Sequence, residues 1–349
     1  MPATPRFIAA DRVLVVAPHP DDETLAAGIA IQSALEAGAL VRVLYVTDGD
    51  NNPWPQRWLE KRWSIGEAER TRWGARRRQE AEQARAALAV RDRVAEARHL
   101  GWPDQGLTDA LMHDDRALAT LVAEVVAFSP TSILMPALDD RHPDHSALHV
   151  MVELALLRAG GVSQRHCYVI HGAPHAPANE VDPAFLARKA SAMEAYVSQL
   201  SLSRRRLSGF VARPERFVAV VNPVAPALDA DGAMRIPLGT PGNSPWRHEV
   251  LLVIAAREAA LRVRGTVPRF ARDGVELLLA DEAGGLSVKA KIIDGTLRVV
   301  PPTAPLAAWA KLHRAGPRIV VFDRTRWHGA CDPGSSLPVI ERRVATGLG

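Results

Sequence analysis

Two short clusters of histidine and carboxylate residues could carry chemistry in this chain. They are Pro18-His19-Pro20-Asp21-Asp22-Glu23 and His142-Pro143-Asp144-His145. In the first, one imidazole and three carboxylates lie within five residues, and their mutual repulsion is costly unless a cation or a substrate compensates it. A divalent metal ion is the simplest compensator. The two clusters together therefore predict a metal site.

The residue types also suggest a division of tasks. Catalytic zinc usually takes three protein ligands of the His, Asp or Glu type and keeps one position open. His19, Asp22 and His145 make such a set. Asp21 and His142 are then candidates for a general base and for a donor to a developing oxyanion. Adjacent carboxylates along an extended backbone cannot easily bind one ion, which favours dividing Asp21 and Asp22 between base and ligand.

Each cluster follows an apolar run that is typical of a buried strand, at residues 13–16 and 132–137. A helical pattern follows each cluster. A further strand-like run at residues 41–46 completes a βαβ unit, which predicts a parallel sheet. If the two strands are neighbours in that sheet, both clusters face one another at its carboxyl edge, where open α/β sheets place their sites. For either cluster alone, a polar turn that caps a helix, with Asp144 as the N-cap, is the alternative.

The alternation of strands and helices continues to about residue 221. It predicts a doubly wound, Rossmann-like α/β domain with a mostly parallel sheet over residues 1–222. Residues 51–73 hold four tryptophans and are expected to be irregular, because Pro53 and Pro55 argue against a helix at their start. Their indole rings could form platforms for sugars or pack onto the core. We expect further helices at 24–37, 67–89, 114–128, 146–158 and 185–200, and strands at 94–100, 166–171 and 217–221.

The amino-acid composition of the chain changes after Asn222. Residues 223–245 are rich in Pro, Gly and Asp, which predicts a boundary. Short alternating runs beyond it predict a smaller β-rich C-terminal region over residues 223–349. This region carries no chemical motif, so it could shape the substrate cleft, mediate dimerisation or dock a partner enzyme. Its strands are expected at 249–254, 276–280, 286–293, 296–300 and 318–322.

The composition is that of an ordinary soluble protein, with 47% hydrophobic and 23% charged residues. No apolar run reaches the roughly 20 residues of a membrane helix, and the N-terminus lacks the apolar centre of a secretory signal. We therefore expect a cytoplasmic protein, with peripheral contact at the inner face of the membrane as an option. The two cysteines suggest neither a disulfide framework nor a thiolate metal site. A net charge of +4 fits a solvated Arg-rich surface better than nucleic-acid binding, and the oligomeric state is left open.

Together the two clusters resemble the signature of the PIG-L/LmbE family of zinc-dependent N-deacetylases, which act on N-acetyl amino sugars and related glycosides. The first motif is highly specific, and the pair is more so. The resemblance extends over roughly residues 10–220 and leaves the C-terminal region unexplained. Weaker similarities are found at Thr47-Asp48-Gly49, Arg77-x-x-Glu80, Leu100-Gly101-Trp102-Pro103-Asp104 and Tyr196-Val197-Ser198-Gln199.

The resemblance implies roles for six residues of the two clusters. His19, Asp22 and His145 would hold Zn2+. Asp21 would be the general base that takes a proton from the attacking water and later returns it to the leaving amine. His142, kept protonated and oriented by Asp144, would stabilise the tetrahedral oxyanion. This fits the chemistry of zinc, which activates water and polarises a carbonyl group.

Substrate contacts follow from the resemblance as well. Asp50, Arg77 and Asp104 lie where the substrate-facing loops and helix of the family would place them. They would bind sugar hydroxyls or a neighbouring phosphate. Arg77 could equally be a helix-surface residue or a buried ion-pair residue.

We therefore expect a zinc-dependent hydrolase that removes the acetyl group from an N-acetylhexosamine unit. The substrate could be a glycolipid or a surface-polysaccharide precursor of the lipopolysaccharide type. One alternative is a deacetylase of a small glycoside, such as a thiol precursor or an aminoglycoside intermediate. Another is a non-catalytic glycan-binding protein with a structural metal. Asp21 and His142 are surplus to metal ligation, which argues against that last alternative.

Overall fold

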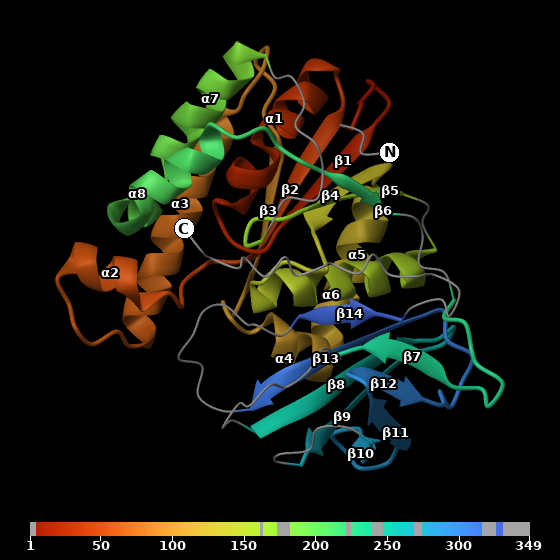
Figure 1. The fold of residues 1–349 in the computed structure, drawn as a ribbon. Helices are drawn as coiled ribbons and strands as arrows, with labels where there is room; N and C mark the ends of the chain where they lie inside the picture. Colours follow the sequence, from red (N-terminus) through yellow and green to blue (C-terminus); the bar gives the residue numbers. More distant parts are fainter. Residues whose placement is uncertain are drawn as a thin grey trace, which may run out of the picture. The chain divides into compact units, whose positions relative to one another are not determined.

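The first apolar run of the chain forms the central strand of a sheet in the first of two units (Figure 1). The units are Met1–Pro223 with Pro317–Trp327, and Val224–Gly316 with His328–Gly349. The boundary expected after residue 222 lies in a segment outside the described residues. The computed structural model describes residues 5–160, 163–172, 182–220, 225–238, 247–268, 274–315 and 326–330.

The sheet of the first unit has six strands in the order β3-β2-β1-β4-β5-β6. All neighbouring pairs are parallel except β5 and β6. The order reverses between β1 and β4, and open α/β sheets bind ligands outside the carboxyl ends of the strands at such a point. The strands are β1 (Arg12–Ala17), β2 (Leu40–Thr47), β3 (Glu96–Trp102), β4 (Ser132–Pro136), β5 (Gln164–Tyr168) and β6 (Val218–Val220).

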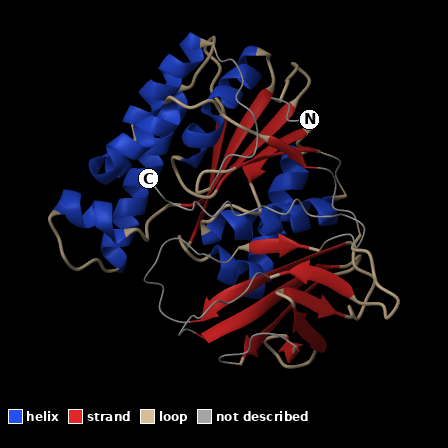
Figure 2. Cartoon of the chain, in the orientation of Figure 1, coloured by secondary structure: helices blue, strands red, loops and turns tan. Residues whose placement is uncertain are grey.

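Helices cover both faces of this sheet (Figures 1 and 2). One layer contains α1, α3, α7 and α8, and the other contains α4, α5 and α6. The expected doubly wound α/β class is thus confirmed. The helices are α1 (Asp22–Glu36), α2 (Pro53–Glu60), α3 (Glu67–Ala87), α4 (Leu107–His113), α5 (Asp115–Phe128), α6 (Pro143–Ala159), α7 (Pro183–Glu194) and α8 (Val197–Val211).

Two expectations about helices were wrong. Residues 53–60 form α2, because Pro53 occupies the first helical turn, where its missing N–H costs nothing, and the side chain of Asn52 accepts from the N–H of Trp54. The single helix expected over residues 185–200 is two helices, α7 and α8, separated at Ala195 and Tyr196. At this break the Tyr196 side chain is fully buried.

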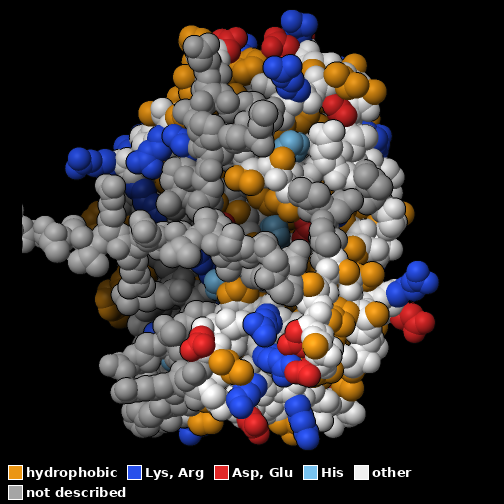
Figure 3. Space-filling model, turned by 45° about the vertical axis from the view of Figure 1, so that its right-hand side comes forward, with side chains coloured by type: hydrophobic (Ala, Val, Ile, Leu, Met, Phe, Trp, Pro, Cys, Tyr) orange, Lys and Arg blue, Asp and Glu red, His pale blue; other side chains and the backbone are white. Residues whose placement is uncertain are grey.

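The second unit contains an eight-stranded sheet in the order β14-β13-β8-β9-β10-β11-β12-β7. The expected β-rich region is therefore present, and it includes strands β7, β9, β13 and β14, which the pattern did not predict. The strand expected at residues 318–322 lies outside the described residues. Basic and acidic side chains are interspersed over this unit in the lower part of Figure 3. The strands are β7 (Met234–Pro237), β8 (Arg247–Ala255), β9 (Ala260–Val267), β10 (Val275–Ala280), β11 (Ser287–Ile293), β12 (Thr296–Val299), β13 (Ala307–Ala315) and β14 (Trp327–Gly329).

Candidate active site

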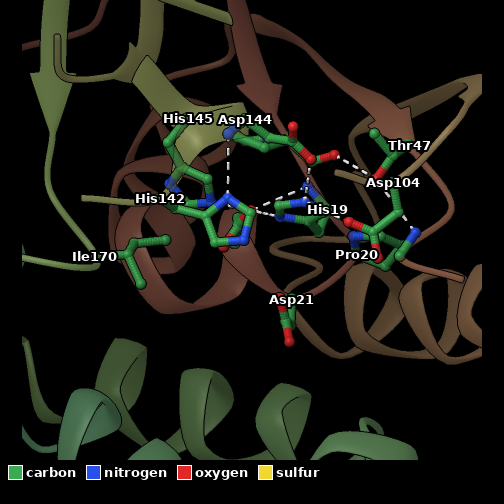
Figure 4. Close-up of polar contacts among 12 residues, drawn as sticks. His19, Pro20, Asp21, Thr47, Asp104, His142, Asp144, His145 and Ile170 are labelled. Atoms are coloured by element: carbon green, nitrogen blue, oxygen red, sulfur yellow. Dashed lines mark hydrogen bonds and ion pairs between the residues drawn. The ribbon is translucent and has the colours of Figure 1, made fainter. Parts of the chain in front are cut away.

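Three imidazole rings meet where the loops after β1 and β4 approach one another (Figure 4). His19 follows β1, while His142 and His145 lie at the start of α6. The ring centroid of His19 is 4.8 Å from that of His142 and 5.3 Å from that of His145, and the last two are 4.9 Å apart. The two sequence clusters are therefore brought together at the point where the strand order reverses.

Asp22, the first residue of α1, lies between two of these rings. Its Oδ2 atom is 3.1 Å from Nδ1 of His19 and 3.2 Å from Nε2 of His145. Despite that short distance, Nε2 of His145 is buried and is not aligned for a hydrogen bond with any described group. A ring nitrogen that faces a carboxylate oxygen without a hydrogen bond is suited to sharing a cation with it.

The remaining nitrogen of each ring faces a second carboxylate. Nε2 of His19 lies 3.1 Å from Asp104 and 3.3 Å from Asp144, and Nδ1 of His145 lies 3.2 Å from Asp140. Histidines that bind metals usually direct their other nitrogen to a carboxylate or carbonyl, which fixes the tautomer and the ring orientation. This arrangement leaves the inner nitrogens, which face Asp22, as the ones that could bind a cation.

The charges of this site also fit a bound cation. Burial alone would lower the pKa of His145, but Asp22 and Asp140 outweigh it and raise that pKa to about 10. Burial is likewise outweighed at His19, whose pKa is raised well above its ordinary value, chiefly by Asp104. Without a cation these imidazoles hold protons that balance the carboxylates. A divalent cation would displace those protons, as metal binding to His ligands does generally.

Three groups of three described residues in the same place could hold an ion, and none of them contains His19, Asp22 and His145 together. The donor atoms of each group lie within 4.8 Å of one another, and all are nitrogen or oxygen, which suits zinc and similar divalent ions. These overlapping groups are His19 with His142 and His145, Asp22 with His145 and His171, and His19 with Asp104 and Asp144.

Asp21 lies apart from the imidazoles, and its side chain points away from them in Figure 4. Its φ angle of 110° is unusual for a residue other than glycine, and it turns the chain so that Asp21 and Asp22 diverge. Oδ2 of Asp21 lies 3.3 Å from Nη2 of Arg77. Burial raises the pKa of Asp21 to about 7, with Arg77 opposing and Asp22 adding to the shift. That value suits a general base at neutral pH.

Glu23 stabilises the turn at Asp21 and Asp22. Its carboxylate is fully buried and accepts from the hydroxyl groups of Thr24 and Tyr196. It also accepts from the backbone N–H of Asp21 at 3.1 Å. Glu23 therefore holds the loop in place through these hydrogen bonds.

The surroundings of His142 differ from what the resemblance implied. The backbone N–H of Asp144 donates to Nδ1 of His142 at 3.3 Å. The carboxylate of Asp144 instead accepts from the backbone N–H groups of Gln105 and Leu107, at 2.6 and 3.1 Å. Burial, together with positive charge on His19 and His145, lowers the pKa of His142 to about 4. The ring is therefore neutral at pH 7, and because Nδ1 accepts, the proton is on Nε2.

The three expected substrate contacts lie in different surroundings. Arg77 is buried and donates to the carbonyl groups of Pro20 and Gly49 besides pairing with Asp21, as in the buried ion-pair alternative. Asp104 also accepts from the backbone N–H of Asn51 at 3.0 Å. Both residues line a cavity of about 150 Å3 next to the imidazoles. Asp50 is half-buried in the loop after β2 and is not among the described residues that line it.

Two residues of the site were not singled out from the sequence. Asp140 is fully buried, and its Oδ2 atom accepts from the backbone N–H groups of Ile170 and His171. The ring of His171 lies 5.0 Å from that of His145. His171 was expected inside a strand, but β5 ends at Tyr168, so His171 belongs to the loop after it. Position after a strand end, the signal that found the other histidines, would have found this one.

The sequence of the first unit matches a described family. Residues 14–156 match the family model described as PIG-L, GlcNAc-PI de-N-acetylase. This segment is a PIG-L family domain. It runs from β1 into α6 and so includes both sequence clusters. The expected family is confirmed, and the family match supports the expected enzyme class, a metal-dependent N-deacetylase.

A comparison with solved structures finds several that are similar to part of this chain. The N,N'-diacetylchitobiose deacetylase from Pyrococcus horikoshii is 18% identical with a TM-score of 0.48, over 60% of this chain and 84% of that one. The conserved protein TT1542 from Thermus thermophilus is 24% identical with a TM-score of 0.46, over 61% and 96%. The 4-carboxy-2-hydroxymuconate hydratase GalB from Pseudomonas putida KT2440 is 18% identical with a TM-score of 0.45, over 62% and 98%. The family assignment rests on the sequence match.

Proposed function

We propose that the protein is a zinc-dependent N-deacetylase that removes the acetyl group from an N-acetylhexosamine unit of a glycoconjugate. One observation carries the proposal. Asp22 lies between the inner nitrogens of His19 and His145, both outer nitrogens face carboxylates, and Asp21 lines the same cavity as His19 and Asp22, with a pKa near 7. A cation held by His19, Asp22 and His145 would supply a Lewis acid for water and for the acetyl carbonyl.

The remaining side chains would move and hold protons. Asp21 accepts a proton from the attacking water and returns it to the amine nitrogen as the C–N bond breaks, which leaves acetate and a free amine. His142 donates from Nε2 to the oxyanion as a neutral ring. Its tautomer is fixed by the backbone N–H of Asp144. In this assignment Asp144 orients His142 through its backbone, and its carboxylate holds the loop of Gln105 and Leu107.

The surface beside the site favours a substrate larger than a free sugar. Trp54, Trp58 and Trp63 are 58%, 65% and 80% exposed, whereas Trp73 is buried in the core. They lie on or just after α2, whose capping residue Asn52 lines the catalytic cavity. The guanidinium of Arg57 lies 5.1 Å from the ring centroid of Trp54 and 5.3 Å from that of Trp63. Indole and arginine side chains together suit sugar faces and lipid headgroups.

This surface supports a lipid-linked or polysaccharide precursor as the substrate. Among the described residues, no helix is long and apolar enough to cross a membrane. Contact with a membrane would then be peripheral, through the exposed tryptophans, and a cytoplasmic location remains a prediction from the sequence. Turnover of lipid-linked and free N-acetylhexosamine should be compared on the purified protein. Much faster deacetylation of free or thiol-linked sugars would instead favour the small-glycoside alternative.

Acetate release from N-acetylglucosamine glycosides, with and without a chelator, tests the reaction itself. We expect activity to fall in the chelator and to return when Zn2+ is added. Asp21→Asn should lower kcat by about 10² to 10⁴-fold while the protein keeps its metal content. Asp92→Asn, at an exposed loop position where Asn also tolerates the positive φ angle, is the matched control. Full activity in a metal-containing Asp21→Asn protein would refute the assigned base.

A further inference from the structure

A second cavity lies next to the catalytic one in the first unit. Its volume is about 650 Å3, compared with about 150 Å3 for the cavity beside the imidazoles. Leu25, Ile170 and Phe210 line both cavities, so the two adjoin at these three side chains. An acetamido group and one sugar ring do not need the larger space, whose volume is typical of sites for whole small molecules.

The larger cavity begins within one helical turn of the proposed metal ligands. Leu25 follows Asp22 by three residues on α1 and therefore lies on the same face of the helix. The backbone N–H of Ile170 donates to Asp140, the carboxylate that also faces His145, at 2.9 Å. Ile170 and His142 both line the catalytic cavity. A substrate whose amide reacts at the imidazoles would thus have a second part within reach of this cavity.

The wall of the larger cavity is mainly apolar. Its apolar side chains include Leu25, Ala26, Phe210, Val218 and Val220. Its charged residues are Asp139, Arg213, Glu215 and Arg216. The charge of Glu215 is balanced by Lys189, whose Nζ lies 2.6 Å away. The cavity therefore joins an apolar interior to a small number of charged groups.

Two further lining residues, His149 and Cys167, could have formed a reactive pair. Sγ of Cys167 lies 3.8 Å from Nδ1 of His149. Burial raises the pKa of the Cys167 thiol far above its ordinary value and lowers the pKa of His149 to about 4. Nδ1 of His149 also lies 3.0 Å from the carbonyl oxygen of Pro136, which holds the ring. Both groups are therefore neutral and form an uncharged part of the cavity wall. Because the thiolate is the nucleophilic form, the pair is not reactive.

We infer that this cavity binds an apolar chain of the substrate, carried by the same molecule whose amide reacts at the imidazoles. The inference rests on the proposed N-deacetylase function. The chain has two possible chemical sources. It is either an apolar aglycone on the sugar or a longer acyl group on the sugar nitrogen.

Binding tests the inference without turnover. Metal-free protein is titrated calorimetrically with the methyl and the octyl glycoside of N-acetylglucosamine, below the concentration at which the octyl compound forms micelles. We expect the octyl glycoside to bind at least about tenfold more tightly, because each buried methylene adds to affinity. A matching pair of glucosamine methyl glycosides, N-acetyl and N-octanoyl, distinguishes the second source. Equal affinities in both pairs would overturn the inference.

Two variants on the edge strand β6 test where the apolar chain of the substrate binds. Val218→Trp adds a ring to a position that lines the cavity, and Ala219→Trp adds the same ring at the next position, on the opposite face of the strand. The preference for the long chain should disappear in the first variant and remain in the second. Ala26→Phe blocks the cavity from α1 and replaces Val218→Trp if that protein does not fold. Unchanged preference in a folded blocking variant would also overturn the inference.

Turnover separates this inference from the proposed function. Amine release is measured on the same three compounds, since the methyl glycoside of N-acetylglucosamine belongs to both pairs, with the metal-loaded enzyme. If none is hydrolysed while the long-chain preference in binding is present, the proposed function fails and the cavity assignment stands. If the methyl glycoside is hydrolysed and neither long chain binds more tightly, the proposed function stands and the cavity assignment fails.

Discussion

Two groups of buried charged residues in the first unit differ in what balances them. The rim cluster consists of the carboxylates Asp22, Asp104, Asp140 and Asp144 with the imidazoles of His19 and His145. The helix clamp consists of Lys189 and Glu215. In the rim cluster the carboxylates outnumber the imidazoles, which balance them only when protonated. In the helix clamp one cation meets one anion.

Both residues of the helix clamp also form hydrogen bonds with the backbone of α1. Nζ of Lys189 donates to the carbonyl of Leu25 at 2.9 Å. The carboxylate of Glu215 accepts from the backbone N–H groups of Ile29 and Ala30, at 2.7 and 3.0 Å. The comparison teaches that buried charge alone does not mark a site. The rim cluster, whose charges do not balance among themselves, is the group that indicates a ligand-binding site.

The largest effect is expected at the centre of the rim cluster. Asp22→Asn keeps the shape of the side chain but removes the charge between His19 and His145. We expect the variant to lose its bound metal on dialysis and to lose activity by at least about 10³-fold, because one of three ligands is gone. Metal content by mass spectrometry and acetate release measure the two effects.

A graded control sharpens this prediction. Asp104→Asn changes a carboxylate that faces the outer nitrogen of His19, where Asp144 remains as a second partner. Metal affinity should fall only about 10 to 100-fold, as is usual for residues that support a ligand. If Asp22→Asn held metal as tightly as the unaltered protein, the central position of Asp22 in the site would be wrong.

The effect expected in the helix clamp is on stability. Lys189→Met leaves the Glu215 carboxylate buried without its cation, and breaking a buried pair in this way costs about 3–5 kcal/mol in the free energy of unfolding. The double variant Lys189→Met with Glu215→Gln removes both charges and should recover part of that loss. Urea unfolding of the single and double variants measures the coupling. A single variant destabilised by less than about 1 kcal/mol would show that the pair is not important for folding.

Much of the rim could be predicted from the sequence because its signals are local. A strand followed within a few residues by His19, or by His142, places a polar side chain at the carboxyl edge of a sheet whatever the rest of the chain does. The contributions of Asp104 and Asp140 could not be predicted in this way. Their contacts depend on how the loops after β3 and β4 fold back over the imidazoles. The helix clamp could not be predicted from the sequence for the same reason, since Glu215 lies 26 residues from Lys189.

Fold prediction failed where local signals have two interpretations. Pro53 was taken as a helix breaker, although proline in the first turn of a helix is favourable. Strand β9 contains Arg262, Arg264 and Gly265, and its alternation is too weak to stand out. The break between α7 and α8 lies at Tyr196, whose hydroxyl donates to Glu23 in the core. That contact joins residues far apart in the sequence, so the local helical pattern does not contain it.

A third buried charged group, Glu153 on α6, tests the comparison at a position outside both groups. Oε1 of Glu153 lies 3.2 Å from Nε of Arg165, but neither carboxylate oxygen has a hydrogen bond among the described residues. Burial therefore outweighs Arg165 and raises the pKa of Glu153 to about 7. Between pH 4.5 and 7 the folded protein then holds this proton more tightly than the unfolded chain does, so stability decreases as the pH rises.

Glu153→Gln removes that dependence. The amide resembles the protonated acid, so the variant should match the unaltered protein near pH 4.5. It should become more stable than the unaltered protein by up to about 3 kcal/mol at about pH 8, from about 1.4 kcal/mol for each unit by which the pKa is raised. The difference in unfolding free energy between the two proteins at both pH values isolates this group from every other titration. A variant that is less stable at the higher pH would mean that Glu153 and Arg165 form a balanced pair like the helix clamp.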